Sequence, residues 1–135
     1  MRIVDDALYG DVKPRKRHQH HEDALHTQIA RALEMLLDRE KVEWWSNENR
    51  FNGAREGARR KARGCRAGVP DMEFHHDGRS LFIELKHGDN RPTKAQRDIH
   101  ASLRRQKMSV AVCRSLDDVV SVLRDVGFPM RGELA

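Results

Sequence analysis

Two acidic residues and a lysine in the middle of the chain have the types and spacing needed for phosphate chemistry. Asp71 follows Gly68-Val69-Pro70, and twelve residues separate it from Glu84, which lies with Lys86 in the run Phe82-Ile83-Glu84-Leu85-Lys86. Carboxylates bind Mg²⁺ through oxygen, usually together with waters and substrate phosphate. An adjacent ammonium group can stabilise a phosphate or orient an attacking water. Together the three residues suit hydrolysis of a phosphodiester.

A predicted β-hairpin brings these residues together. Asp77-Gly78 is a strong two-residue turn signal between strand-like runs over residues 71–76 and 79–86. Counting outward from this turn places Asp71 directly opposite Glu84. Because like charges opposite each other destabilise a sheet, a bound divalent cation would explain the pair. The structural alternative is a solvated strand surface that carries a glutamate–lysine pair.

The same register sorts the hairpin side chains onto two faces, since strand residues alternate with period two. The apolar face is the expected core face, and it holds Met72, Phe74, Leu81, Ile83 and Leu85. The opposite face holds Asp71, Glu73, Phe82, Glu84 and Lys86.

The composition favours a polyanionic partner. The chain has 135 residues and a formal net charge of +5, which suits one domain that binds a polymer such as nucleic acid. Two basic runs supply candidate DNA phosphate contacts, although such runs are also common on solvated surfaces. The candidates are Lys13, Arg15, Lys16 and Arg17 in the first run, and Arg55, Arg59, Arg60, Lys61, Arg63 and Arg66 in the second.

Cysteine content and hydropathy exclude several classes of protein. Cys65 and Cys113 form no C-x-x-C pair, which argues against a zinc knuckle and against a disulfide framework. The sequence shows no signal-peptide pattern, and no apolar run approaches the roughly 18–20 residues of a membrane span. We therefore expect a soluble cytoplasmic protein that does not associate with a membrane. A phage or bacterial source is a separate expectation.

The segments before the hairpin differ in how clearly they are patterned. Residues 1–20 lack periodicity and are expected to form a basic, histidine-containing arm. Residues 21–39 have an apolar stripe at helical spacing, and residues 42–47 are a first strand. Residues 48–68 are polar and rich in glycine, which predicts a loop with a short helix around residues 58–62.

The segments after the hairpin carry clear boundary signals. Thr93 and Gln96 form a Thr-x-x-Gln capping box at the start of a helix. A strand follows over residues 109–114, and Ser115 caps a last helix that Gly127 ends. The order αβββαβα predicts an α/β fold with a mixed central sheet flanked by helices.

These residues resemble the VRR-NUC family, the virus-type replication and repair nucleases of the PD-(D/E)xK nuclease superfamily. The resemblance spans most of residues 21–126. It is carried by Gly68-Val69-Pro70-Asp71, Phe82-Ile83-Glu84-Leu85-Lys86 and Thr93-Lys94-Ala95-Gln96, with an upstream helix bearing Glu22 and a segment around Asn47 and Asn49. It implies a restriction-endonuclease-like αβββαβα core and a single nuclease domain over residues 21–135.

The resemblance also implies roles for the central residues. Asp71 and Glu84 would be ligands of Mg²⁺ or Mn²⁺, and Lys86 would be the catalytic lysine. The backbone carbonyl of Leu85 would be a further metal ligand.

Two further catalytic candidates come from the resemblance, and each has an open alternative. Gln96 matches the glutamine on the helix that follows the family motif, but helix capping competes with that role. Glu22 is the candidate acid on the first helix, where it would also be a metal ligand. Its structural alternative is to complement the helix dipole, and Asp23 and Glu34 are rival acids on the same helix.

The expected function is that of a metal-dependent DNA endonuclease that hydrolyses phosphodiester bonds. Resemblance to the stand-alone relatives implies a homodimer acting on branched DNA such as a four-way (Holliday) junction. The alternative from another class is an inactive nucleic-acid-binding module on a nuclease fold. RNA is a third possible ligand, although the sequence shows no clear stacking surface for single-stranded bases.

Several histidines accompany the predicted site. Transition-metal binding and simple solvent exposure are both open for the cluster near the first helix, which consists of His18, His20, His21 and His26. His87 follows Lys86 and could contact substrate. His100 follows Gln96 by one helical turn, so it lines the same cleft or packs in the core.

Overall fold

The computed structural model describes residues 13–47 and 54–132, and within these ranges the side chains of residues 13–20, 54 and 56 are outside the description. The elements are α1 (Lys13–Leu36), β1 (Glu43–Ser46), α2 (Ala54–Ala62), β2 (Met72–His76), β3 (Arg79–Leu85), α3 (Lys94–Arg105), β4 (Ser109–Cys113) and α4 (Leu116–Asp125). Apart from the short helix α2, this is the predicted order αβββαβα.

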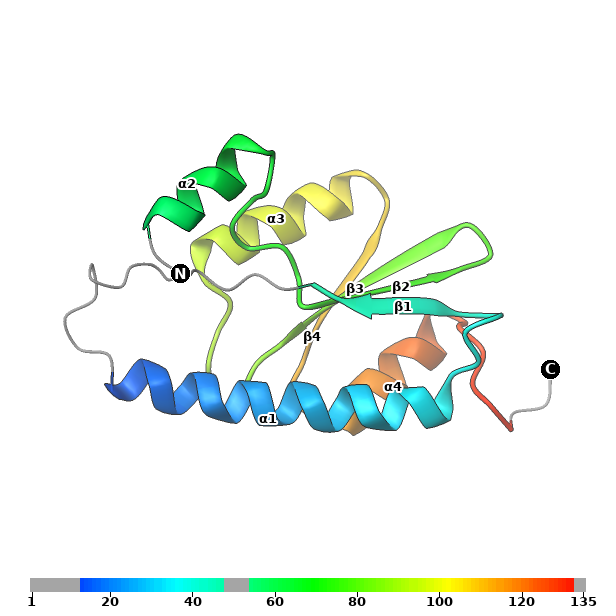
Figure 1. The fold of residues 1–135 in the computed structure, drawn as a ribbon. Coiled ribbons are helices and arrows are strands. Elements are labelled where there is room, and N and C mark those ends of the chain that lie inside the picture. The colour runs from blue at the N-terminus through cyan, green and yellow to red at the C-terminus, as the bar shows by residue number, and fades with distance from the viewer. Residues whose placement is uncertain (1–12, 48–53, 133–135) are drawn as a thin grey trace.

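The four strands form one mixed sheet in the order β1-β2-β3-β4. The pairs β1–β2 and β2–β3 are antiparallel, and β3–β4 is parallel because α3 carries the chain back before β4 begins. Figure 1 shows α1 and α4 on one face of the sheet and α3 on the other. The α/β class and the mixed sheet flanked by helices are confirmed.

The hairpin of β2 and β3 has the predicted register. Met72 pairs with Ile83, and His76 pairs with Arg79. Asp77 and Gly78 have φ values of 51° and 77°, which a type I′ turn requires at both central positions. The turn chemistry therefore fixes which hairpin side chains face the core.

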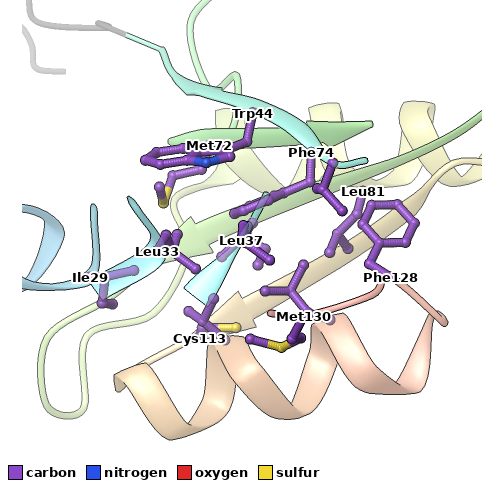
Figure 2. Close-up of a cluster of buried hydrophobic side chains, with 14 of the residues drawn as sticks. Ile29, Leu33, Leu37, Trp44, Met72, Phe74, Leu81, Cys113, Phe128 and Met130 are labelled. Atoms are coloured by element: carbon purple, nitrogen blue, oxygen red, sulfur yellow. The ribbon is translucent and has the colours of Figure 1, made fainter. Parts of the chain in front are cut away.

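The core lies between the sheet and the helices α1 and α4 (Figure 2). The stripe of α1 buries Ile29 and Leu33, Leu37 continues it directly after the helix, and the apolar face of the hairpin packs against these residues. Trp44 stacks on Phe74 with ring centroids 6.2 Å apart. Truncating a core side chain such as Leu33 to alanine would cost about 2–5 kcal/mol.

Two helix boundaries differ from the sequence-based expectation. Helix α1 begins at Lys13 rather than at residue 21 and ends at Leu36, so the first basic run is helical rather than an irregular arm. Apolar periodicity cannot find this part, but Lys, Arg and Gln are good helix formers and Pro14 is tolerated in a first turn. Helix α2 likewise begins at Ala54, four residues before the expected short helix.

In the part of the chain that the structure describes, no helix is both long enough and apolar enough to cross a membrane.

Candidate active site

A close approach of two backbone segments sets the position of Asp71. Gly68 has a φ of +90°, and a Cβ atom there would lie 2.4 Å from the carbonyl oxygen of Ala95 in the first turn of α3. Only glycine fits both the conformation and the space. The segment Gly68-Val69-Pro70 is thereby packed against α3, and it delivers Asp71 to the start of β2.

Backbone and side-chain hydrogen bonds then hold Asp71 between two strands. Its carbonyl oxygen accepts from the N–H of Asn47 at 2.7 Å, and its Oδ2 accepts from the N–H of Leu85 at 2.8 Å. Its carboxyl group also lies close enough to that of Glu84 for each to shift the pKa of the other. The structure therefore brings together the two carboxylates that the hairpin register pairs.

Glu84 is buried on the face of the sheet that α3 covers, with a relative exposure of 2%. Its Oε2 accepts from Nε2 of Gln96 at 3.0 Å and lies 3.9 Å from Nζ of Lys86. Its Oε1 lies 3.6 Å from Nε2 of His100, too far for a hydrogen bond, and has no other partner among the described residues. One oxygen of this buried carboxylate is thus left unsatisfied.

Gln96 has both of the roles that the sequence left open as alternatives. Its Oε1 accepts from the backbone N–H of Thr93 at 2.8 Å, which completes the capping box of α3. This bond fixes the orientation of the amide, so Nε2 is directed at Glu84. Helix capping and contact with the acidic pair are therefore compatible.

Burial dominates the electrostatics of the acidic pair. It raises the pKa of Glu84 to about 7, against the opposing effects of Asp71 and Lys86. Burial also raises the pKa of Asp71 well above its usual range, and the charge of Glu84 acts in the same direction. Two ionised carboxylates this close are unfavourable, so the pair favours a shared proton or a bound cation at neutral pH.

Lys86 is buried beside this pair, with a relative exposure of 6%. Its backbone N–H donates to the carbonyl of Cys113 at 3.0 Å, which continues the parallel β3–β4 pairing past the end of β3. The backbone that carries the ammonium group is therefore held by the sheet, and its Nζ lies 3.9 Å from Oε2 of Glu84.

Glu22 contacts the loop that follows Lys86. Its Oε2 accepts from Nδ2 of Asn90 at 3.2 Å and from the N–H of His87 at 3.5 Å, and its charge contributes to raising the pKa of Glu84. Its rival Glu34 pairs with Arg39 at 3.0 Å instead. Among the side chains that the structure describes (residues 21–47, 55 and 57–132), no group of three or more His, Cys, Asp or Glu residues is arranged to hold a metal. The roles of Glu22 and of the Leu85 carbonyl as metal ligands stay predictions.

The second basic run lies on α2 and the segment after it, on the same side of the sheet as α3 (Figure 1). Its members Arg55, Arg59, Lys61, Arg63 and Arg66 are exposed, and Arg60 is half-buried. A hydrogen bond from Lys94 lowers the pKa of Asp98 on α3, and Arg66 adds to that effect. Arg66 of this run therefore lies near α3, the helix that covers the site. The first run (Lys13, Arg15, Lys16 and Arg17) is in α1, and its side chains lie outside those described.

Four of the histidines whose side chains the structure describes lie near the site. His21 stacks on His87 with centroids 4.3 Å apart, and His26 hydrogen-bonds Ser46 Oγ at 2.8 Å. Burial lowers the pKa of His100, so its imidazole is neutral. The side chains of His18 and His20 are not among those described, so a metal site in the histidine cluster stays a prediction.

The Asn47 side chain has a structural role that its sequence position does not reveal. Its Nδ2 donates to the carbonyl of Pro70 at 3.1 Å and to Glu73 at 2.9 Å, which braces the segment that carries Asp71. The position of Asn47 at the end of a predicted strand was a signal too weak to identify this contact.

Comparison with solved structures finds the same fold elsewhere. The chain is similar to a solved structure described as a VRR_NUC domain protein, with a TM-score of 0.58 and 22% sequence identity over 76% of this chain and 84% of the other. The sequence matches no protein-family model, and no curated protein matches it. At this identity the likeness shows a VRR-NUC-like, restriction-endonuclease-like fold.

Proposed function

We propose that this protein is a metal-dependent DNA endonuclease whose centre consists of Asp71, Glu84 and Lys86. The observation that carries the proposal is the buried carboxylate of Glu84, which has an unsatisfied oxygen and a second carboxylate beside it. An unpaired buried acceptor costs about 1–3 kcal/mol, so the arrangement is costly unless a ligand completes it. A binding module would gain nothing from this negative charge beside DNA phosphates.

The residues present fit a divalent cation. Asp71 and Glu84 would hold Mg²⁺ or Mn²⁺, with the carbonyl of Leu85 as a further oxygen ligand, and substrate phosphate and waters would complete the coordination. When bound, such a cation polarises a phosphate and lowers the pKa of a water. The raised pKa of Glu84 is consistent with this role, because the charge of a cation would offset the cost of ionising the buried pair.

The remaining side chains of the site would stabilise negative charge on the substrate and hold the Glu84 carboxylate in position. Lys86 is buried next to Glu84, where its ammonium would stabilise negative charge that develops on the scissile phosphate. Gln96 restrains the Glu84 carboxylate from the rigid first turn of α3. The neutral His100 lies beside the other oxygen of that carboxylate, with its Nε2 3.6 Å from Oε1.

The basic surface favours DNA as the substrate. The exposed arginines and lysine of α2 and its following segment would contact backbone phosphates without reading bases. By resemblance to the family, we propose a homodimer that acts on branched DNA such as four-way junctions. Two-fold symmetry would then present two sites to two strands of a junction.

The experiment is a cleavage assay on matched linear, flap, splayed-arm, and four-way-junction DNA, with Mg²⁺, Mn²⁺ or EDTA. The wild-type chain and Glu84→Gln are compared, and Glu40→Gln on the exposed α1–β1 turn is the matched control. Metal-dependent cutting of the junction that Glu84→Gln alone loses would support the proposal. Binding in EDTA without cleavage of any of these substrates would favour the inactive binding module, and cleavage of matched RNA instead would reassign the substrate.

A further inference from the structure

A basic pocket lies beside the candidate active site, on the open edge of the sheet. It is formed by the loop that joins β3 to α3, by the first half of α3 and by the end of β4. Three arginines line it, namely Arg91, Arg97 and Arg114, and Asp89 is the acidic residue among its lining. Neither the family motif nor the two basic runs of the sequence include these arginines.

The strand register places this pocket next to the acidic pair. Val112, which lines the pocket, pairs with Glu84 in the parallel β3–β4 ladder, so the two side chains share one face of the sheet. Neighbouring strands lie about 4.8 Å apart. The loop that forms the rest of the pocket begins directly after Lys86 and runs down to α1, where Asn90 contacts Glu22 (Figure 1). The pocket therefore adjoins the site along the sheet.

Hydrogen bonds to the loop hold two of the arginines in place. Nη1 of Arg114 donates to the carbonyls of Gly88 at 2.6 Å and Asn90 at 2.7 Å. Nη1 of Arg97 donates to the carbonyl of Pro92 at 2.8 Å. Each guanidinium has five N–H donors, so both keep donors for a ligand. Arg91 has no hydrogen bond or ion pair with any residue that the structure describes.

We propose that this pocket binds a phosphate group of the DNA strand that is cut, an inference that rests on the proposed function. Guanidinium groups match phosphate oxygens in geometry and charge, and restraint by the loop carbonyls lowers the entropic cost of binding. The lining contains no aromatic ring on which a base could stack. Arg91 and Arg97 are positioning residues in this proposal, because they hold the strand across the acidic pair without touching the reacting phosphate.

The test measures binding of a short labelled duplex oligonucleotide by fluorescence anisotropy in EDTA. The variants are Arg91→Gln and Arg97→Gln, and the matched control is Arg105→Gln at the exposed far end of α3. Arg114 is left intact because it holds the loop. We expect each pocket variant to weaken binding roughly tenfold and to lower the salt dependence by about one phosphate contact. The control should bind like the wild type.

A scan with single neutral methylphosphonate linkages identifies the phosphate. At one position of the neutral linkage, the wild type should bind the oligonucleotide more weakly. Arg97→Gln should show no additional loss of affinity at that position, because it already lacks the same contact. Loss at an internal linkage would support a backbone-phosphate site. Loss only on removal of a terminal phosphate would support the pocket and assign it to a strand end. Additive losses at every position, or pocket variants that bind like Arg105→Gln, would overturn it.

The same experiment separates this inference from the proposed function. Binding in EDTA requires no cleavage, so a chain that never cuts DNA but shows the Arg97 effect would retain the pocket and lose the proposed activity. Normal metal-dependent cleavage together with unchanged binding in both pocket variants would retain the proposed activity and overturn the phosphate pocket.

Discussion

Nε2 of Gln96 donates a hydrogen bond of 3.0 Å to Oε2 of Glu84, so the first turn of α3 is joined directly to the acidic pair. The same amide caps the helix through Thr93. Because one side chain makes both contacts, the start of α3 and the position of the Glu84 carboxylate are linked. Substitutions at Thr93 and at Gln96 can test the two contacts separately.

Thr93→Ala and Gln96→Ala should have different effects on cleavage. Thr93→Ala removes the capping hydroxyl and should lower the free energy of unfolding by about 1 kcal/mol while keeping cleavage at saturating substrate. Gln96→Ala should lower stability similarly and also reduce the cleavage rate roughly tenfold. Chemical denaturation and single-turnover cleavage measure the two effects. Equal rates for the two variants would mean that Gln96 is only a helix cap.

Gly68→Ala should displace Asp71 from its position in the site. The added Cβ would lie 2.4 Å from the Ala95 carbonyl, whereas the Cβ of Gly64→Ala meets no atom within 4 Å at nearly the same φ. In both variants an alanine at positive φ should lower the free energy of unfolding by about 1–2 kcal/mol. Only Gly68→Ala should lower it by about 1–3 kcal/mol more, because of the clash, and only this variant should lose cleavage activity. Thermal denaturation and cleavage assays of this pair isolate the contact. If the two variants prove equally stable and active, the packing of Gly68 on α3 does not position the site.

The stability of the metal-free protein should fall as pH rises. The pKa of Glu84 is about 7 in the folded chain, above its ordinary value of 4.5, so between these values the folded state binds more protons than the unfolded state. The stabilising proton is fully present below pH 4.5 and is lost as pH rises through about 7. The loss is on the order of 3 kcal/mol. Urea denaturation in EDTA at pH 5 and pH 8 measures it.

Glu84→Gln is the control for this pH dependence, because it removes the titrating group and keeps the shape. Its stability should fall less between pH 5 and pH 8, and it should exceed the wild type in stability at pH 8. Asp71 contributes a remaining slope of the same sign, since its pKa is also raised. A wild-type stability that rises from pH 5 to pH 8 in EDTA would contradict the account of a buried, costly acidic pair.

Lys86→Met should separate chemistry from binding. Methionine keeps most of the buried stem and removes the ammonium that lies 3.9 Å from Glu84. We expect cleavage to fall roughly 10²–10³-fold, as for the loss of one transition-state donor, with DNA affinity in EDTA nearly unchanged. Gel-shift and single-turnover assays test this. A parallel loss of affinity and rate would place Lys86 in ground-state binding instead.

The parts of the fold that the sequence predicts well are those set by local chemistry. The turn at Asp77-Gly78 fixes the hairpin register, and Thr93 and Gln96 mark the start of α3, so the meeting of Asp71 and Glu84 follows from short-range signals. Helix α1 is predicted only where its apolar stripe packs on the sheet. Its first part has no such stripe, so the beginning at Lys13 was missed.

Contacts between distant elements explain what the sequence left open in the site. The approach of His100 to Glu84 depends on the rotation of α3 about its axis, which helical spacing restricts without fixing. The pocket of Arg91, Arg97 and Arg114 requires the parallel placement of β4 beside β3 and the path of the intervening loop. These are long-range packing results, and no local motif encodes them.

The most direct test of the central claim is a Mn²⁺ titration followed by electron paramagnetic resonance at pH 8, on the wild type, Glu84→Gln and the control Glu40→Gln. We predict saturable Mn²⁺ binding by the wild type and the control, and loss of that binding in Glu84→Gln while the variant remains folded. Equal Mn²⁺ binding in all three proteins, or none in the wild type with and without DNA, would contradict the claim that Asp71 and Glu84 hold the metal.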